Sequence, residues 1–352
     1  MTDLALRFAA QAEQCAVNGS PLTAALLTGA AEDLATGGAV AELLAPHATD
    51  PAGSVVSLRF AGSLHRLVLE RRAPALALHY PSVGGTAPVE DVWPAARAAV
   101  ERELAALGPL LRRPVQTNEV GRGAALYGGL LLMAAATGLP VRLLEVGASA
   151  GLNLRVDRFA YRVGDEVLGE PGSPVQLEQP WTGAHPVGAV RVVERRGCDP
   201  APVDPLSAEG RLTLTSYVWA DQVPRLERLR GALALAAQVP AQVERAPAGE
   251  FLVRELVDPR PGMVTVVWHS VVRQYMAPAE RDTVDAVLAA AGARATREAP
   301  LVRLSMEPEL AVGDGFGFPV VAQVWPSGEQ VHVADALGHG PPVRWTGRRL
   351  WS

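Results

Sequence analysis

The sequence contains no lysine and no isoleucine, and all 32 of its basic residues are arginines. Without lysine, Schiff-base chemistry, pyridoxal phosphate attachment and a P-loop are excluded, because each requires a lysine amine. The two cysteines, Cys15 and Cys198, are too few for a disulfide framework or a cysteine-rich zinc site. The histidines form no H-x-x-x-H pair, so the sequence gives no support for a metal site.

The net charge of -5 argues against a broad phosphate-binding face, and we expect no nucleic-acid partner. At 352 residues and 49% hydrophobic composition, the chain is long enough to bury a large core and to form two units. The N-terminus has an acid at Asp3 and no basic region before an apolar run. A cytoplasmic protein is therefore expected.

One uncharged segment, 123–141, is about as long as a membrane span. Gly128 and Gly129 interrupt it, Pro140 ends the helical pattern, and Arg142 follows directly. We therefore predict a buried helix, a turn and a strand here, and no membrane association.

Residues 1 to 139 are predicted to form a helical N-terminal domain, because their apolar residues recur at helical spacing. Ser20-Pro21 and Asp50-Pro51 each place a capping side chain before a proline at the first helical position. Another amphipathic run covers Asp91 to Leu107. The sequence thus predicts several helices in this part of the chain.

From residue 140 to 352, short apolar runs alternate with helical stretches, which predicts an α/β domain with a mostly parallel sheet covered on both faces. The seven predicted strands lie at 141–146, 189–195, 241–245, 262–268, 300–306, 318–325 and 329–335, and the clearest helices lie at 223–238 and 278–291.

Two features interrupt this alternation. Pro326-Ser-Gly328 links the last two predicted strands tightly enough to form an antiparallel hairpin. The segment near 155–188 contains several prolines and a predicted turn at Gly164-Asp165. We interpret it as an insertion that follows the first helix of the domain.

The stretch LLEVGASAGLNL at 143–154 supports two interpretations of Ser149. Gly147 to Gly151 spells G-x-S-x-G, the nucleophile elbow of α/β-hydrolases. Such an elbow normally follows several strands of its sheet, whereas this one follows the first. The alternative is a ligand-binding turn in which Gly147, Ser149 and Gly151 let the backbone approach a ligand, while Glu145 meets a cationic or hydroxyl group. A dinucleotide fingerprint is excluded, because glycine is missing at Ser149 and Leu152.

Polar candidates also lie in VQTNEVGR at 115–122, where Gln116, Asn118, Glu119 and Arg122 precede an apolar helix. Asn118 can cap a helix that includes Glu119 to Ala136, and Glu119 suits the positive end of that helix. The functional alternative places Glu119 and Arg122 in catalysis and Gln116 and Asn118 at a substrate. The sequence leaves both interpretations open.

His269 ends the run VTVVWH, at the carboxyl end of a predicted parallel strand, where ligands of open α/β sheets bind. It is a candidate catalytic base, and a structural histidine is the alternative. Tyr275, which follows closely, is a candidate substrate-binding residue. Trp219 and Trp268 at their spacings are more typical of core residues.

The chain resembles an uncharacterised bacterial family, the domain of unknown function two-three-three-two (DUF2332), over nearly its whole length. The stretches that carry this resemblance are HYPSVGG at 79–85, VQTNEVGR at 115–122, LLEVGASAGLNLRVDRFAYR at 143–162, GCDPAPVDP at 197–205, YVWADQVPRLERL at 217–229 and VVWHSVVRQYM at 266–276. The domain at 140–352 also resembles the class I S-adenosylmethionine methyltransferase fold, which implies a Rossmann-like sheet.

The methyltransferase resemblance implies S-adenosylmethionine as cofactor. The resemblance assigns the methionine portion of this cofactor to Glu145, Gly147, Ser149 and Gly151, and the ribose hydroxyls of the cofactor to Asp199. An acid beside the adenine is missing after the third strand, where Glu244 is the only substitute. The expected function is methyl transfer to a small molecule. The alternatives are a ligand-binding protein that lost catalysis and a serine hydrolase using Ser149.

Overall fold

The computed structural model describes residues 2–309 and 317–351. Contacts divide the chain into two compact units: Met1–Thr117 with Ser207–Glu227, and Asn118–Leu206 with Arg228–Ser352. The chain thus leaves the first unit after Thr117 and returns to it for one short stretch. Helix α9 (Val223–Ala236) begins in the first unit and ends in the second.

The first unit is helical. Its α-helices before the crossing are α1 (Asp3–Val17), α2 (Pro21–Thr36), α3 (Ala39–Leu44), α4 (Val56–Leu69), α5 (Pro74–Ala77) and α6 (Val92–Leu111), and α8 (Ala208–Ser216) is in the returning stretch. Short 3-10 helices are η1 (Ala45–His47), η2 (Ala52–Ser54), η3 (Pro81–Val83) and η4 (Val89–Asp91). Apolar residues of α1, α2, α4 and α6 form one continuous core.

Local capping explains one helix start and not another. Ser20 accepts the amide of Thr23 with Pro21 at the first turn of α2, as its sequence predicts. The prediction for Asp50-Pro51 is wrong, because no α-helix starts there and α4 begins only at Val56. Asp50 instead accepts a hydrogen bond from Arg59 at 2.8 Å.

The second unit is built on a nine-stranded mixed sheet of order β5-β12-β11-β10-β9-β8-β1-β6-β7. The strands are β1 (Val141–Val146), β5 (Trp181–Gly183), β6 (Val192–Asp199), β7 (Gln242–Arg245), β8 (Val264–Ser270), β9 (Leu301–Met306), β10 (Phe318–Trp325), β11 (Glu329–Leu337) and β12 (Gly340–Trp345). The five strands from β7 to β9 are parallel, and β10, β11 and β12 continue the sheet in antiparallel pairs.

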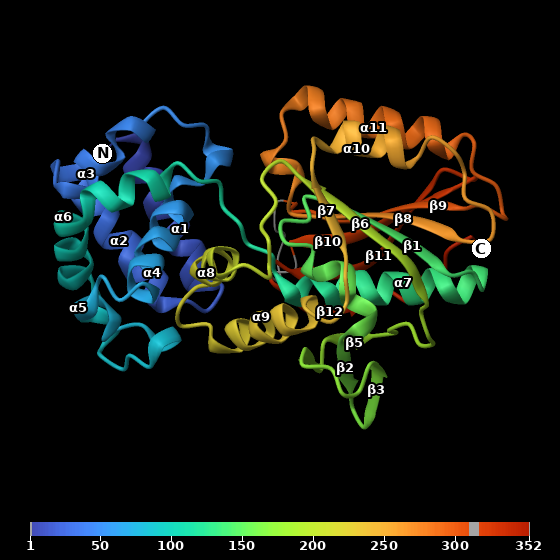
Figure 1. Cartoon of the computed structure of the whole chain (residues 1–352), viewed down its shortest axis with the longest axis horizontal. Helices are drawn as coiled ribbons and strands as arrows, with labels where there is room; N and C mark the ends of the chain where they lie inside the picture. Colours follow the sequence, from blue (N-terminus) through green and yellow to red (C-terminus); the bar gives the residue numbers. More distant parts are fainter. Residues whose placement is uncertain (1, 310–316, 352) are drawn as a thin grey trace. The chain divides into compact units, whose positions relative to one another are not determined.

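Helices cover both faces of this sheet (Figure 1). Helices α10 (Ala248–Glu255) and α11 (Pro278–Gly292) lie on one face, where Phe251 and Val284 join the cluster that contains Leu144 and Val267. Helix α7 (Gly123–Thr137) lies on the other face. It lies so close that a side chain at Gly129 would meet Leu304 of β9.

The predicted count of seven strands is wrong. All seven predicted strands are present, and the hairpin at Pro326–Gly328 joins β10 to β11 as its sequence predicts. The sheet gains β12, which contains Pro341 and Pro342, residues that are depleted in strands, and β5, which has only three residues.

The prediction of a helix after the first strand is also corrected. The segment after β1 forms the 3-10 helix η6 (Leu152–Arg158) rather than an α-helix. The insertion then forms a three-stranded sheet of β2 (Ala160–Val163), β3 (Glu166–Gly169) and β4 (Gln176–Glu178). Strands β2 and β3 pair antiparallel around the predicted turn at Gly164-Asp165.

One window, Val120–Thr137, is long and apolar enough to cross a membrane, and 67% of it is buried inside the protein. It covers the 3-10 helix η5 (Val120–Arg122) and α7. The same composition is found in core helices of soluble proteins, so the window is weak evidence for a membrane span.

Candidate functional site

The segment Gly147–Gly151, which we call the glycine turn, directly follows β1. Gly147, Ser149 and Gly151 have φ angles of 70°, 53° and 67°, all in the left-handed region. Glycine adopts this conformation without cost, whereas serine does so at a cost of about 1–2 kcal/mol. The alternation of small residues in the sequence therefore reflects backbone geometry as well as space for a ligand.

Asp199, at the end of β6, is hydrogen-bonded to the glycine turn. Its Oδ2 accepts the amide of Ser149 at 2.9 Å, and its Oδ1 accepts the amide of Ala201 at 2.8 Å. The side chain is buried. The structure thus brings together the predicted turn and the predicted ribose-binding acid, which are 50 residues apart in sequence.

Asn118 connects VQTNEVGR to the same turn. Its Oδ1 accepts the amides of Ala150 at 3.2 Å and Leu152 at 3.0 Å. The prediction that Asn118 caps a helix is wrong, because Glu119 caps η5 through the amide of Gly121, and α7 begins only at Gly123. Two motifs that the sequence presents separately therefore form one site.

Glu145 supplies a buried acid near the end of β1. It is 3% exposed, and its Oε2 has no hydrogen-bond partner among the described residues. Burial raises the pKa of this carboxyl to about 8; Arg155 and Arg122 oppose the shift, and Asp199 adds to it. At neutral pH the carboxyl is therefore largely protonated and can donate a hydrogen bond.

We expect replacement of Glu145 by glutamine to change how stability depends on pH. Because the folded-state pKa of about 8 lies above the ordinary glutamate value of 4.5, the native protein binds more protons than the unfolded chain between these pH values. The contribution of Glu145 to the free energy of unfolding is full below this pH window and is lost as the pH rises through it. The free energy of unfolding of Glu145→Gln should therefore rise relative to that of wild type by on the order of a few kcal/mol between pH 5 and pH 9.

Urea unfolding of both proteins at several pH values measures this difference. The matched control is Glu244→Gln, which changes a half-buried acid near the end of β7 that forms an ion pair with Arg254. A stability difference between wild type and Glu145→Gln that stays constant from pH 5 to pH 9 would contradict the raised pKa.

Arg122 and Asn153 surround the acid and the turn. Arg122 donates from Nε to the carbonyl of Gly338 at 3.0 Å. Asn153 donates from Nδ2 to the carbonyl of Glu119 at 3.1 Å, and its buried Oδ1 has no partner in the described parts of the chain. Sequence reasoning missed Asn153, although it lies within LLEVGASAGLNL beside the residues that were singled out.

His269 lies on the opposite face of the sheet from Glu145. Glu145 is registered with Trp268 of β8, and successive residues of a strand point to opposite faces. Both ring nitrogens of His269 are engaged: Nδ1 lies 2.6 Å from Oε1 of Glu307, and Arg303 donates from Nε to Nε2 at 3.0 Å. Burial lowers the pKa of His269, while Glu307 opposes that shift. The ring is therefore neutral, with its proton on Nδ1.

Three predicted residues remain, namely Gln116, Tyr275 and Glu244. Gln116 is buried in the first unit. Tyr275 lies in the 3-10 helix η7 (Arg273–Tyr275) and is 46% exposed. Glu244, the candidate for the adenine side, forms an ion pair with Arg254.

Within the described ranges, no group of three or more histidine, cysteine or acidic side chains is arranged to hold a metal ion. The turn, the two acids and the arginines around them offer amide, carboxyl and guanidinium groups, which are able to hydrogen-bond to an organic ligand. They therefore form the candidate site.

Residues 5–345 match the model of a family described as "Uncharacterized protein conserved in bacteria (DUF2332)". The chain belongs to this family. No curated protein matches the chain. The DUF2332 match includes both the helical unit and the sheet, so the family comprises the two units together.

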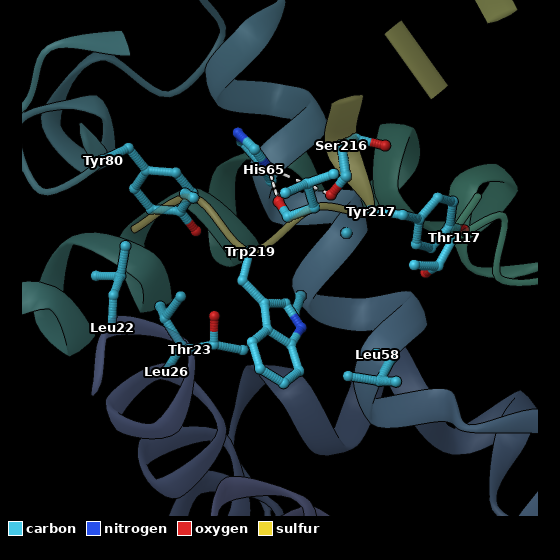
Figure 2. Close-up of a pocket in the computed structure, with 14 residues that line it drawn as sticks. Leu22, Thr23, Leu26, Leu58, His65, Tyr80, Thr117, Ser216, Tyr217 and Trp219 are labelled. Atoms are coloured by element: carbon cyan, nitrogen blue, oxygen red, sulfur yellow. Dashed lines mark hydrogen bonds between the residues drawn. The ribbon is translucent and has the colours of Figure 1, made fainter. Parts of the chain in front are cut away.

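Two other stretches of the DUF2332 resemblance, HYPSVGG and the beginning of YVWADQVPRLERL, line a cavity in the first unit (Figure 2). Its volume of about 30 Å³ admits one or two water molecules. Tyr80 contributes a buried hydroxyl without a partner in the described structure. The cavity is therefore too small for a cofactor in this conformation.

His65 above this cavity is neutral. Its Nδ1 lies 3.2 Å and 3.0 Å from the carbonyls of Ser216 and Val218, and its Nε2 lies 2.8 Å from the hydroxyl of Ser82 (Figure 2). Because carbonyls only accept, Nδ1 carries the proton. Burial lowers the pKa of the ring to about 4, although both carbonyls oppose this shift. His65 therefore links α4 to the returning stretch.

Proposed function

We propose that this chain binds S-adenosylmethionine at the glycine turn and catalyses methyl transfer to a small molecule. The five parallel strands have the order β7-β6-β1-β8-β9, so the direction of strand addition reverses between β1 and β8. Rossmann-like sheets bind nucleotides at the carboxyl ends of their strands at such a reversal. The glycine turn follows β1 at this position.

The observation that carries the proposal is the bond between Asp199 and the Ser149 amide. An acid at the end of the second parallel strand lies against a turn of small residues after the first, as it does where such sheets hold a ribose. The carboxylate bonds to two amides, so its position is fixed before a ligand arrives.

The residues present fit the polar end of this cofactor. Glu145 has a buried oxygen without a partner among the described residues, and a ligand donor or acceptor would satisfy it. We assign Glu145, Gly147, Ser149 and Gly151 to the methionine portion and Asp199 to the ribose. The bound cofactor would supply an activated methyl group on a sulfonium. Arg122, Asn118 and Glu119 would orient the acceptor and keep water out, which is what methyl transfer mainly needs.

Titration calorimetry and thermal unfolding with S-adenosylmethionine and S-adenosylhomocysteine test the proposal. A ligand that binds only the folded protein at a hundred times its Kd stabilises it by about 2.7 kcal/mol, which shifts a melting curve measurably. ATP and NAD are the control nucleotides. If neither sulfur-containing ligand produces heat or a shift, the proposal fails.

Binding without catalysis is a second candidate function, and the geometry of His269 favours it. The Nε2 lone pair of His269 is occupied by Arg303, so the ring cannot take a proton unless that contact breaks. Saturable binding of S-adenosylmethionine without release of S-adenosylhomocysteine in the presence of candidate acceptors would support this function.

The Ser149→Ala variant separates these functions from hydrolysis. Alanine keeps a small side chain and the backbone amide that bonds to Asp199, so affinity for S-adenosylhomocysteine should fall by no more than one hydrogen bond, about 0.5–1.5 kcal/mol. A nucleophilic serine would instead react with a fluorophosphonate probe, and its alanine variant would not. We expect no labelling of Ser149; stoichiometric labelling of the wild type would establish the hydrolase alternative.

A further inference from the structure

The segment Val271–Arg273, which we call the β8 loop, follows β8 and contains a strained residue. Val271 has a φ angle of 52°. A β-branched residue rarely adopts the left-handed conformation, and it persists there only when the surrounding contacts impose it. Such strain is concentrated at ligand sites and switch segments.

The β8 loop lies on the glycine turn. A side chain added at Gly147 would place its Cβ 2.4 Å from Cγ2 of Val272. Val272 is partly buried and packs against the cluster that contains Val146 and Cys198. The side of Gly147 on which a Cβ would stand is therefore covered by the isopropyl group of Val272.

Glu307, the residue directly after β9, holds this loop in place. Its carboxylate accepts the amides of Val272 at 3.2 Å and Arg273 at 3.3 Å, and it also bonds to His269. Arg273 is fixed at its other end by Asp285, which it contacts through two bonds of 2.8 Å. The backbone of β9 holds only the start of the loop, where Val271 donates its amide to the carbonyl of Met306 at 3.0 Å, and side chains hold Val272 and Arg273.

We infer that Val272 is a movable cover over the glycine turn, that Glu307 is the latch which keeps it closed, and that a ligand enters when the β8 loop opens. The part of this inference that concerns ligand entry rests on the proposed function. The opening itself is a property of the loop, because the strain at Val271 favours release once the carboxylate contacts weaken.

A native cysteine reports the opening without any ligand. Cys198 is 1% exposed, and its sulfur accepts the amide of Gly147. Cys15, buried in the first unit, is an internal control for global unfolding. Labelling both thiols with a maleimide under native conditions, followed by peptide mass spectrometry, measures the two rates separately.

Glu307→Gln and Val272→Ala should each accelerate labelling of Cys198 at least about tenfold and leave Cys15 unchanged. Val287→Ala is the matched control, because Val287 packs against the same cluster and does not cover Gly147. If labelling of Cys198 is unchanged in both variants, or if labelling of both cysteines is accelerated in parallel, Glu307 is not the latch of the β8 loop.

The ligand part is tested by titration with S-adenosylhomocysteine. Val272→Ala should bind it about three- to tenfold more tightly than wild type, because less apolar contact is lost on opening, while Val287→Ala should match wild type. Equal or weaker binding by Val272→Ala would overturn the cover. If wild type and variants all fail to bind, the proposed function fails, and the labelling rates alone decide whether the loop opens.

Discussion

Under the proposed function, replacement of Asp199 by alanine should abolish binding of S-adenosylhomocysteine, and it should lower the free energy of unfolding by about 2–4 kcal/mol. The change removes two charged acceptors, one from the amide of Ser149 and one from the amide of Ala201. Each such bond to a charged group contributes about 1.5–3 kcal/mol, and partial access to water reduces the sum. Titration with S-adenosylhomocysteine and urea unfolding measure the two effects.

Two variants control for this result. Asp199→Asn keeps one acceptor oxygen, so its loss of stability should be intermediate. Glu244→Ala removes an acid near the end of the adjacent strand that forms a partly exposed ion pair with Arg254, and should cost no more than about 1 kcal/mol. Wild-type affinity in Asp199→Ala would remove this acid from the site.

Gly147→Val should lower the free energy of unfolding by about 3 kcal/mol or more and remove ligand binding. A valine would have to adopt a φ angle of 70°, and its Cβ would lie 2.4 Å from Val272. The backbone strain costs about 1–2 kcal/mol, and the steric overlap adds to it. The contact with Val272 therefore predicts a loss of stability together with the loss of binding.

Gly138→Val separates the two causes. Gly138 has a φ angle of 66°, and nothing lies within 4 Å of an added side chain. This variant therefore has the backbone strain without the collision, and its free energy of unfolding should fall by only about 1–2 kcal/mol. Equal losses of stability in the two variants, measured by urea unfolding, would show that Val272 moves away from the added side chain without lowering the free energy of unfolding.

The strands of the second unit could be predicted because buried parallel strands are short apolar runs between helical stretches. VRLLEV and VTVVWHS are of this kind, and they form β1 and β8. Strand β12 could not be found in this way, since its pairing with β11 and β5 holds a proline-rich segment in an extended conformation. Tertiary pairing there overrides local preference.

The candidate site could be predicted in its parts but not in its connections. Small residues after a strand identified the glycine turn, and the strand end identified Asp199. The amides that Asn118 accepts are 32 and 34 residues away, so no local pattern distinguishes this role from a helix cap. Glu307 lies 38 residues beyond His269 and follows a different strand. Nothing in its own neighbourhood indicated that it would fix the histidine and the β8 loop.

The interrupted course of the helical unit has a consequence for synthesis on the ribosome. Leu22 donates its amide to Asp221 at 3.0 Å, and Arg66 pairs with Glu209 at 2.6 Å, so early helices depend on residues made much later. The nascent chain must extrude β1 and β6 before these partners emerge. The helices made first should therefore complete their folding only after residue 227 has left the exit tunnel, and nascent chains arrested before Ser207 should expose them to protease.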